Sequence, residues 1–195
     1  YKLMYFFGYP ELKGSERAEL YDLEADREEL TDLSASQPDL TRSLLAQLPF
    51  ALTGAQRRAF AEIARDLAAP HPMQRLLQGD VGSGKTCVAA LAMLQAAENG
   101  RQAVLMAPTE ILAEQHHRKL ADWLAPLGIE VAWLSGSRRR KAREATLARL
   151  AAGELLLAVG THALIEDPVA LPLLALAVVD EQHRFGVRQR LALRE

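Results

Sequence analysis

The segment Gly79-Asp80-Val81-Gly82-Ser83-Gly84-Lys85-Thr86 carries the clearest chemistry in the sequence. It matches the phosphate-binding pattern G-x-x-x-x-G-K-[ST] at every constrained position. Glycines let backbone N–H groups turn inward around phosphate oxygens, because no Cβ stands in the way. Lys85 can then offer its charge to the β- and γ-phosphates of ATP, and the Thr86 hydroxyl can ligate Mg²⁺. An ordinary glycine turn between a strand and a helix is the alternative interpretation.

Two carboxylates follow an apolar stretch further along the chain. Leu174–Val179 has the composition of a buried strand, and Asp180 and Glu181 come directly after it. Adjacent carboxylates are unfavourable without a cation nearby. We expect Asp180 to hold Mg²⁺ through its water shell and Glu181 to orient and deprotonate the attacking water. With Lys85 these acids are the predicted catalytic residues, and Asp180 joins Thr86 as a predicted metal ligand. An acidic turn after a strand is the alternative.

The elements that must position these residues alternate along the chain. Apolar runs and turn residues predict strands at 75–78, 103–107, 129–134, 155–159 and 174–179, and helical spacing predicts helices at 41–48, 53–67, from the glycine loop onwards, at 109–124 and at 138–151. This alternation predicts an α/β fold with a mostly parallel sheet and helices on both faces. Because such sheets bind ligands at the carboxyl ends of their strands, we expect both motifs at that edge.

The charge of the chain is unevenly distributed. Its 195 residues carry a formal net charge of -2, but residues 1–40 alone sum to -6 and the remainder to +4. The proline and small polar residues of 34–39 look like a linker. We therefore expect residues 1–40 to be an acidic N-terminal segment and linker, an appendage that forms a surface helix or a partly ordered arm. Residues 41–195 would be the domain that binds the nucleotide.

Composition also excludes several classes of protein. Cys87 is the only cysteine, so no disulfide can form within the chain, and its position in a helix favours packing. Residues 3–7 are too few for the apolar core of a secretory signal, and residues 169–179 are too few to span a bilayer. We expect a soluble protein of the reducing cytosol with no membrane partner. The histidines lack zinc-ligand spacing.

The two motifs together resemble those of superfamily-two helicase motors. Longer strings are similar to RecG-type helicases, bacterial translocases of branched DNA: LPFALTGAQ at 48–56, APTEILAEQH at 107–116, GTHAL at 160–164 and DEQHRFGV at 180–187. The resemblance covers residues from about 49 to the C-terminus. It implies a RecA-like P-loop NTPase domain that forms the first, ATP-binding lobe of a two-lobe motor.

The resemblance implies further roles. Gln56 would read the adenine edge with Phe50 packed near the base, while Gln182 and His183 would couple the nucleotide state to movement. The residues that would line the path of the DNA are Pro108, Thr109, Glu110, Gln115, Gly160, Thr161 and His162. Thr109 is equally explained as the cap of the helix that follows it, and His116 and His117 as solvated helix surface.

The implied activity is that of an ATP-dependent DNA helicase or translocase. It would remodel branched or forked duplex DNA, by fork regression and Holliday-junction processing, in repair and recombination in the bacterial cytosol, associated with the nucleoid. The alternatives are an Mfd-like translocase that couples transcription to repair, and a nucleotide-binding module without motor activity. Glu181 favours a hydrolase over such a module.

Two parts of the family pattern lie outside this sequence. Residues 1–33 do not resemble the wedge domain that grips the branch point, and the chain stops at Glu195, before the Thr-Ala-Thr-Pro segment and the second lobe. The arginine finger of that lobe contributes on the order of 10³–10⁵ in turnover. We therefore expect the truncated lobe by itself to hydrolyse ATP barely and to unwind nothing.

A basic run opens one of the predicted helices. Arg138, Arg139 and Arg140 belong to the stretch SRRRKAR at 137–143. Positive charge is mildly unfavourable at a helix N-terminus, which favours a polyanion partner, although many such runs are solvated surface. These three arginines are predicted to contact DNA, most simply its phosphates.

Overall fold

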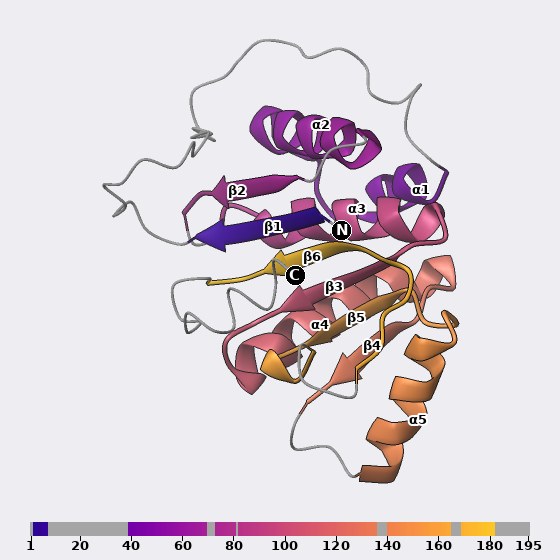
Figure 1. The fold of residues 1–195 in the computed structure, drawn as a ribbon. Helices are drawn as coiled ribbons and strands as arrows, with labels where there is room; N and C mark the ends of the chain where they lie inside the picture. The colour runs from indigo at the N-terminus through magenta and orange to yellow at the C-terminus, as the bar shows by residue number, and fades with distance from the viewer. Residues whose placement is uncertain are drawn as a thin grey trace.

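The computed structural model describes residues 2–7, 39–69, 73–80, 82–135, 140–164 and 169–181. In chain order the elements are β1 (Lys2–Phe7), α1 (Asp39–Gln47), α2 (Gly54–Ala68), β2 (Gln74–Gln78), α3 (Lys85–Glu98), β3 (Gln102–Met106), α4 (Glu110–Leu124), the 3-10 helix η2 (Ala125–Leu127), β4 (Val131–Leu134), α5 (Arg140–Ala151), β5 (Leu157–Gly160), the 3-10 helix η3 (His162–Leu164) and β6 (Leu174–Val179) (Figure 1). The strands and helices predicted between residues 41 and 179 are thus present, with ends shifted by a few residues.

The six described strands form one parallel sheet in the order β2-β1-β6-β3-β5-β4. All the arrowheads point to the same side, the left of Figure 1, so the carboxyl ends of the strands share one edge. Parallel neighbours require crossover connections, which the intervening helices supply. The prediction of an α/β fold with a parallel sheet is confirmed.

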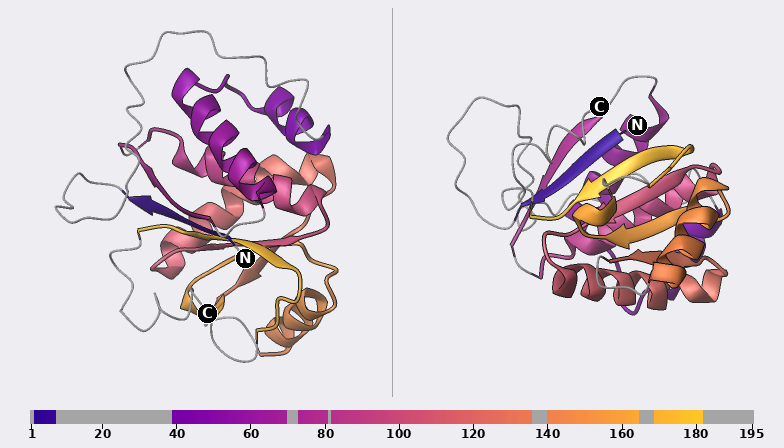
Figure 2. Two further views of the ribbon diagram at one scale, coloured as in Figure 1. Left: turned by 45° about the horizontal axis from the view of Figure 1, so that its top comes forward. Right: turned by 60° about the horizontal axis from the view of Figure 1, so that its bottom comes forward.

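Helices cover both faces of the sheet, but unequally. Side chains of successive strand residues point to opposite faces, so Ala103 and Leu105 join the core beneath α1, α2, α3 and α4. Val104 and Met106 join a second core, to which α5 contributes Leu150 and η3 contributes Leu164. Figure 2 shows the two layers on either side of the sheet. The predicted covering of both faces is confirmed, with four helices on one side.

The position of β1 inside the sheet was not predicted. All of residues 1–40 were expected in an appendage, whereas Lys2–Phe7 pairs with β2 on one side and with β6 on the other. The sequence KLMYFF, apolar and aromatic at five of its six positions, is typical of a buried parallel strand. Its acidic surroundings in the sequence concealed this, because charge was averaged over 40 residues. The acidic stretch 16–32 lies outside the described residues.

Helix α3 is the most deeply buried helix of the described chain. Ten of its residues, mostly Ala and Leu, are buried, because α3 lies between the sheet and the helices α1 and α2. Cys87 is among them, and burial raises the pKa of its thiol to about 11. This supports the packing role predicted for the cysteine. No helix in the described ranges has the length and apolar character needed to cross a membrane.

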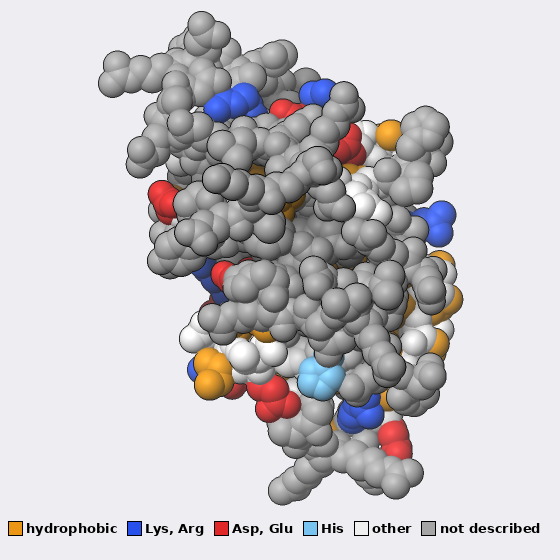
Figure 3. Space-filling view, turned by 60° about the vertical axis from the view of Figure 1, so that its left-hand side comes forward, with side chains coloured by type: hydrophobic (Ala, Val, Ile, Leu, Met, Phe, Trp, Pro, Cys, Tyr) orange, Lys and Arg blue, Asp and Glu red, His pale blue; other side chains and the backbone are white. Residues whose placement is uncertain are grey.

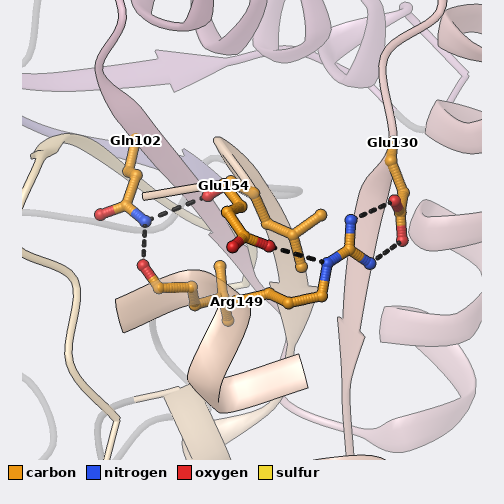
Figure 4. A network of polar contacts seen from close by, with 6 residues as sticks. Gln102, Glu130, Arg149 and Glu154 are labelled. Carbon is orange, nitrogen blue, oxygen red and sulfur yellow. Dashed lines mark hydrogen bonds and ion pairs between the residues drawn. The ribbon is translucent and has the colours of Figure 1, made fainter. Parts of the chain in front are cut away.

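A buried amide ties the end of α5 to the sheet. Gln102, fully buried at the start of β3, donates through Nε2 to the carbonyl oxygens of Leu150 (2.8 Å) and Leu155 (3.0 Å). Its Oε1 accepts from the backbone N–H of Leu173 (3.0 Å). Figure 4 shows this amide beside Arg149, whose guanidinium pairs with carboxylates at the surface. Gln102 therefore satisfies backbone groups of three segments at once.

We expect Gln102→Leu to lower the free energy of unfolding by roughly 2–4 kcal/mol, because the buried carbonyl group of Leu155 and the N–H of Leu173 would lose their side-chain partner, while the carbonyl group of Leu150 keeps its bond from Gly153 N. The control is Arg149→Ala, which removes exposed ion pairs with Glu130 and Glu154 and should cost much less. Urea denaturation measures both losses. Equal losses for the two variants would contradict the role given to the amide.

A candidate nucleotide site at the carboxyl edge of the sheet

The glycine loop joins β2 to α3 and has the backbone that its sequence predicts. Gly84 is the N-cap of α3 with φ 83° and ψ 22°, and Gly82 has φ 86°. Residues with a Cβ rarely adopt these left-handed conformations, so glycine is required at both positions. A turn closed by the bond from Ser83 N to Asp80 O (3.1 Å) brings the loop round to the helix N-terminus. Val81 lies outside the described residues.

Lys85 folds back over this loop. Its Nζ donates to the carbonyl oxygens of Gly79 (2.6 Å) and Asp80 (2.9 Å). Burial lowers the pKa of the Lys85 amine, while the negative charges of Asp180, Glu181 and Asp80 act in the opposite direction. The amine is thus within electrostatic reach of both acids that follow β6. The two halves of the predicted catalytic set come together in the fold.

The backbone of the two acids after β6 is constrained by a hydrogen bond at Asp180 and by a left-handed conformation at Glu181. Asp180 continues the β3–β6 ladder, since its N–H donates to the carbonyl oxygen of Met106 (2.8 Å). Glu181 has φ 51° and is the one non-glycine residue in the described chain with a left-handed backbone. That conformation costs about 1–2 kcal/mol for a residue with a Cβ. Strain of this kind gathers at functional sites, and here it turns the chain directly at the end of the strand.

Gln56 connects helix α2 to the glycine loop. Thr53 and Gln56 form a capping box at the start of α2, in which Gln56 Oε1 accepts from Thr53 N (3.0 Å). Gln56 Nε2 donates to Ser83 O (2.7 Å). Each end of the amide keeps one further hydrogen-bonding position, a donor and an acceptor. These match the acceptor N7 and the N6 amino group of adenine, so the predicted adenine contact is chemically available.

The residues present fit a triphosphate with its metal ion. Ser83 Oγ is buried and finds no hydrogen-bond partner among the described residues. Buried hydroxyls are nearly always satisfied, and a phosphate oxygen would satisfy this one. Thr86 is the second residue of α3, at the helix end that favours anions. Within the described ranges no group of three or more His, Cys, Asp and Glu could hold a metal ion.

Phe50 lies on the surface near this site's helices. Its side chain is 43% exposed and meets Trp123 edge to face, with ring centroids 6.3 Å apart. The packing of Phe50 near the adenine base stays a prediction. Gln182 and His183 lie outside the described ranges, and their coupling role stays a prediction.

The residues predicted to line the DNA path follow β3 and β5 at the same edge of the sheet. Thr109 is the N-cap of α4, where its Oγ1 accepts from Leu112 N (3.3 Å), so the capping interpretation holds. Glu110 accepts a bond from Ser135 at the end of β4 (2.6 Å). Thr161 is buried, whereas Gln115 and His162 are exposed and Pro108 is partly exposed. A polyanion would therefore meet the side chains around Thr109 before that of Thr161.

Close packing explains Gly160, the glycine among the residues predicted to line the DNA path. A Cβ added at Gly160 would collide with the carbonyl oxygen of Leu134 on the neighbouring strand. This glycine is required by the sheet itself, whatever it contacts outside. Figure 3, which brings the side of the carboxyl ends forward, shows both acidic and basic side chains of described residues on this side of the molecule. Arg138 and Arg139 lie outside the described residues, as does the side chain of Arg140, and their DNA contact stays a prediction.

The position of His116 was not predicted from the sequence. Solvated surface was an open interpretation for both His116 and His117, but the His116 side chain is only 15% exposed and its Nε2 lies 2.7 Å from Asp180 Oδ2. His117 Nε2 lies 3.0 Å from the carbonyl oxygen of Val131. The available signal was helical spacing, because His116 comes three residues after Ala113 and four before Leu120, which are both buried.

We expect Gly84→Ala to be more damaging than Gly82→Ala. Both variants force a Cβ into a left-handed conformation, at about 1–2 kcal/mol each. At Gly84 the Cβ would also collide with Nε2 of Gln56, whereas at Gly82 it meets no described atom within 4 Å. Displacing Gln56 should break the capping box and cost roughly 1 kcal/mol more. Urea denaturation compares the two, and equal losses would contradict the packing role of Gln56.

The chain is similar to known helicases. It is 58% identical over 156 residues to the ATP-dependent DNA helicase RecG of Escherichia coli (strain K12), a match that covers 80% of this chain and 22% of that protein. It is 53% identical over 150 residues to the RecG of Bacillus subtilis (strain 168), covering 77% of this chain and 22% of the relative. The chain thus spans about a fifth of the length of the curated relatives that it matches.

A solved structure is similar as well. A chain in the structure of RecG bound to a three-way DNA junction superposes with a TM-score of 0.71 at 46% identity, covering 75% of this chain and 20% of that one. Residues 53–195 match the DEAD/DEAH box helicase family. This range includes the glycine loop, the acids after β6 and every strand from β2 to β6. The chain therefore belongs to the DEAD/DEAH box helicase family.

Proposed function

We propose that this chain is the ATP-binding part of a RecG-type helicase or translocase, which uses ATP hydrolysis to remodel branched DNA. The observation that carries the proposal is the position of the glycine loop and of Asp180 and Glu181 after the carboxyl ends of β2 and β6, two strands that end two residues apart along β1 between them. The negative charges of both acids also act on the Lys85 amine. The 58% identity to RecG supports a RecG-type enzyme that acts on branched DNA, and not the Mfd-like translocase that couples transcription to repair.

The proposed chemistry follows from these groups. The glycine loop and Lys85 hold the phosphates, and an ammonium group there neutralises charge that develops on the γ-phosphoryl group. The Thr86 hydroxyl and Asp180 would hold Mg²⁺, which would neutralise negative charge on the phosphates. Glu181 orients the attacking water and accepts its proton. The adenine lies against Gln56, whose amide has one donor and one acceptor position to spare.

Binding of ATP requires Lys85 to change partners. Its amine donates to two loop carbonyls, those of Gly79 and Asp80. Phosphate oxygens carry more negative charge than carbonyl oxygens and make stronger bonds with an ammonium group. The nucleotide would therefore draw Lys85 away from the loop, and the loop would adjust to the phosphates in the same step.

The DNA would run past the start of α4 and the end of β5. The exposed side chains at this place belong to Thr109, Glu110, Gln115 and His162. Hydroxyl groups and helix N-termini bind phosphates without reading base sequence, which suits an enzyme that recognises the shape of a junction. Localisation in the bacterial cytosol, associated with the nucleoid, is part of the same proposal.

The first test is DNA-stimulated ATP hydrolysis by the full-length protein that carries this chain. We expect Glu181→Gln to lower turnover by roughly 10²–10⁴-fold, because the amide cannot accept the proton of water. The affinity for ATP should change little, since the phosphate contacts remain. The control is Glu130→Gln, which makes the same chemical change at the opposite edge of the sheet, before β4. Turnover of Glu181→Gln equal to that of the control would refute the proposed function.

The second test concerns the basic run. Replacing Arg138, Arg139 and Arg140 together by Gln should weaken junction binding and reduce the slope of log K against log salt by roughly 1–3, about 0.9 for each phosphate that is no longer neutralised. The control is Arg149→Gln on the same helix, whose guanidinium is already paired with Glu130. Fluorescence anisotropy at several salt concentrations measures the slope. An unchanged slope would show that the basic run is solvated surface and does not contact DNA phosphates.

A further inference from the structure

His116 faces the sheet from the buried side of α4. Ala113, Leu120 and Leu124 are buried on this helix, and His116 lies three residues after the first and four before the second. Residues with these spacings share one face of a helix. The side chain of His116 is 15% exposed, as is that of Asp180, so their contact lies largely out of solvent. A polar group placed on a buried stripe needs a partner, and Asp180 is that partner.

The direction of the hydrogen bond follows from its chemistry. His116 Nε2 and Asp180 Oδ2 are 2.7 Å apart. A carboxylate can only accept, so the proton lies on Nε2 and the imidazole donates. The bond is short, as bonds to ionised acceptors are. Asp180 is thus held from two directions, its backbone by Met106 of β3 and its carboxylate by α4.

This arrangement leaves the second carboxylate oxygen, Oδ1, for another ligand. Carboxylates that bind metal ions are themselves held by hydrogen bonds from an outer layer of residues, and loss of such a bond typically costs 10–100-fold in metal affinity or activity. The outer layer matters most where the protein supplies few ligands. Here the proposed ligands of Mg²⁺ are only Thr86 and Asp180, besides phosphate and water.

We infer that His116 is a positioning residue for the metal ion. Its Nε2–H fixes the Asp180 carboxylate by Oδ2 so that Oδ1 faces the water shell of Mg²⁺ bound with ATP. The inference rests on the proposed function, because it requires a metal-bound nucleotide at this edge. The inference adds His116 of α4 to a site whose two sequence motifs come from the segments that follow β2 and β6.

The adjacent histidine is a natural control. His117 belongs to the same helix, is also partly buried, and makes one polar contact of similar kind, from Nε2 to the carbonyl oxygen of Val131 at 3.0 Å. Its ring packs against Trp133, with centroids 5.4 Å apart. Neither contact involves Asp180. Replacing His117 should therefore disturb the packing of α4 on β4 without altering the metal site.

The test measures binding of Mn²⁺, which replaces Mg²⁺ and is visible by electron paramagnetic resonance. The full-length protein is titrated with Mn²⁺ in the presence of a non-hydrolysable ATP analogue. We expect His116→Ala to weaken Mn²⁺ binding at least 10-fold. His116→Gln should recover most of the affinity, because its amide nitrogen takes the place of Nε2. The shorter His116→Asn should not recover it, and His117→Ala should bind Mn²⁺ as the wild type does.

Activity supplies a second measurement. The Mg²⁺ concentration that gives half-maximal ATP hydrolysis should rise for His116→Ala and His116→Asn, and binding of the analogue without metal should stay unchanged. Wild-type Mn²⁺ affinity in His116→Ala would overturn the inference, and so would tighter binding, since the histidine would then compete with the metal. Equal weakening in His117→Ala would assign the effect to the packing of α4 and would also overturn it.

The same preparations separate this inference from the proposed function. If Glu181→Gln abolishes turnover while His116→Ala binds Mn²⁺ normally, only the role of His116 fails. If Glu181→Gln hydrolyses ATP at the wild-type rate, the proposed function itself fails. Thermal melting of each variant shows whether it is folded. If His116→Ala does not fold, the comparison of His116→Gln with His116→Asn still tests the inference.

Discussion

The relative position of the glycine loop and the acids depends on backbone pairing across β1. Within the described sheet β2 does not pair with β6, and β1 lies between them. Its Phe7 is opposite Gln78, the last residue of β2, and its Tyr5 is opposite Val179, the last residue of β6. The two strands therefore end two residues apart along β1, or about 7 Å. Because of this register, the glycine loop that leads to Lys85 and the segment that carries Asp180 begin close together along the carboxyl edge of the sheet.

Polar groups at the carboxyl edge are held by hydrogen bonds with α2, α4 and β3. Gln56 reaches the loop from the N-terminus of α2, His116 reaches Asp180 from α4, and Met106 of β3 accepts from the backbone of Asp180. Each of these bonds ends on an element whose apolar face lies in the larger core. The geometry of the site is thus a consequence of how α2 and α4 pack, and Glu181 can keep a left-handed backbone because its neighbours are fixed.

The sequence alone predicted the parallel sheet and its helices from residue 41 onwards, because short apolar runs and helical spacing are local signals. It also indicated Lys85, Asp180 and Glu181, since their motifs are contiguous. It could not predict β1, because a strand next to an acidic stretch is recognised only when its neighbours in the sheet are known. The contact of His116 with Asp180 was missed for a similar reason: it joins residues 64 apart in sequence, and a lone histidine on a helix has many uses.

The place of β1 in the sheet has a consequence for synthesis of the protein. β1 is the first of the described elements to leave the ribosome, but Lys2 pairs with Leu176, roughly 170 residues later in the chain. At 5–20 residues per second, β1 waits about 10–35 s for β6 to emerge. During that interval the edge of β1 that later pairs with β6 has no strand beside it, and an unpaired strand edge can pair with other chains. Among the described strands, the pairing of β1 with β6 therefore forms only after the elements between them have been synthesised.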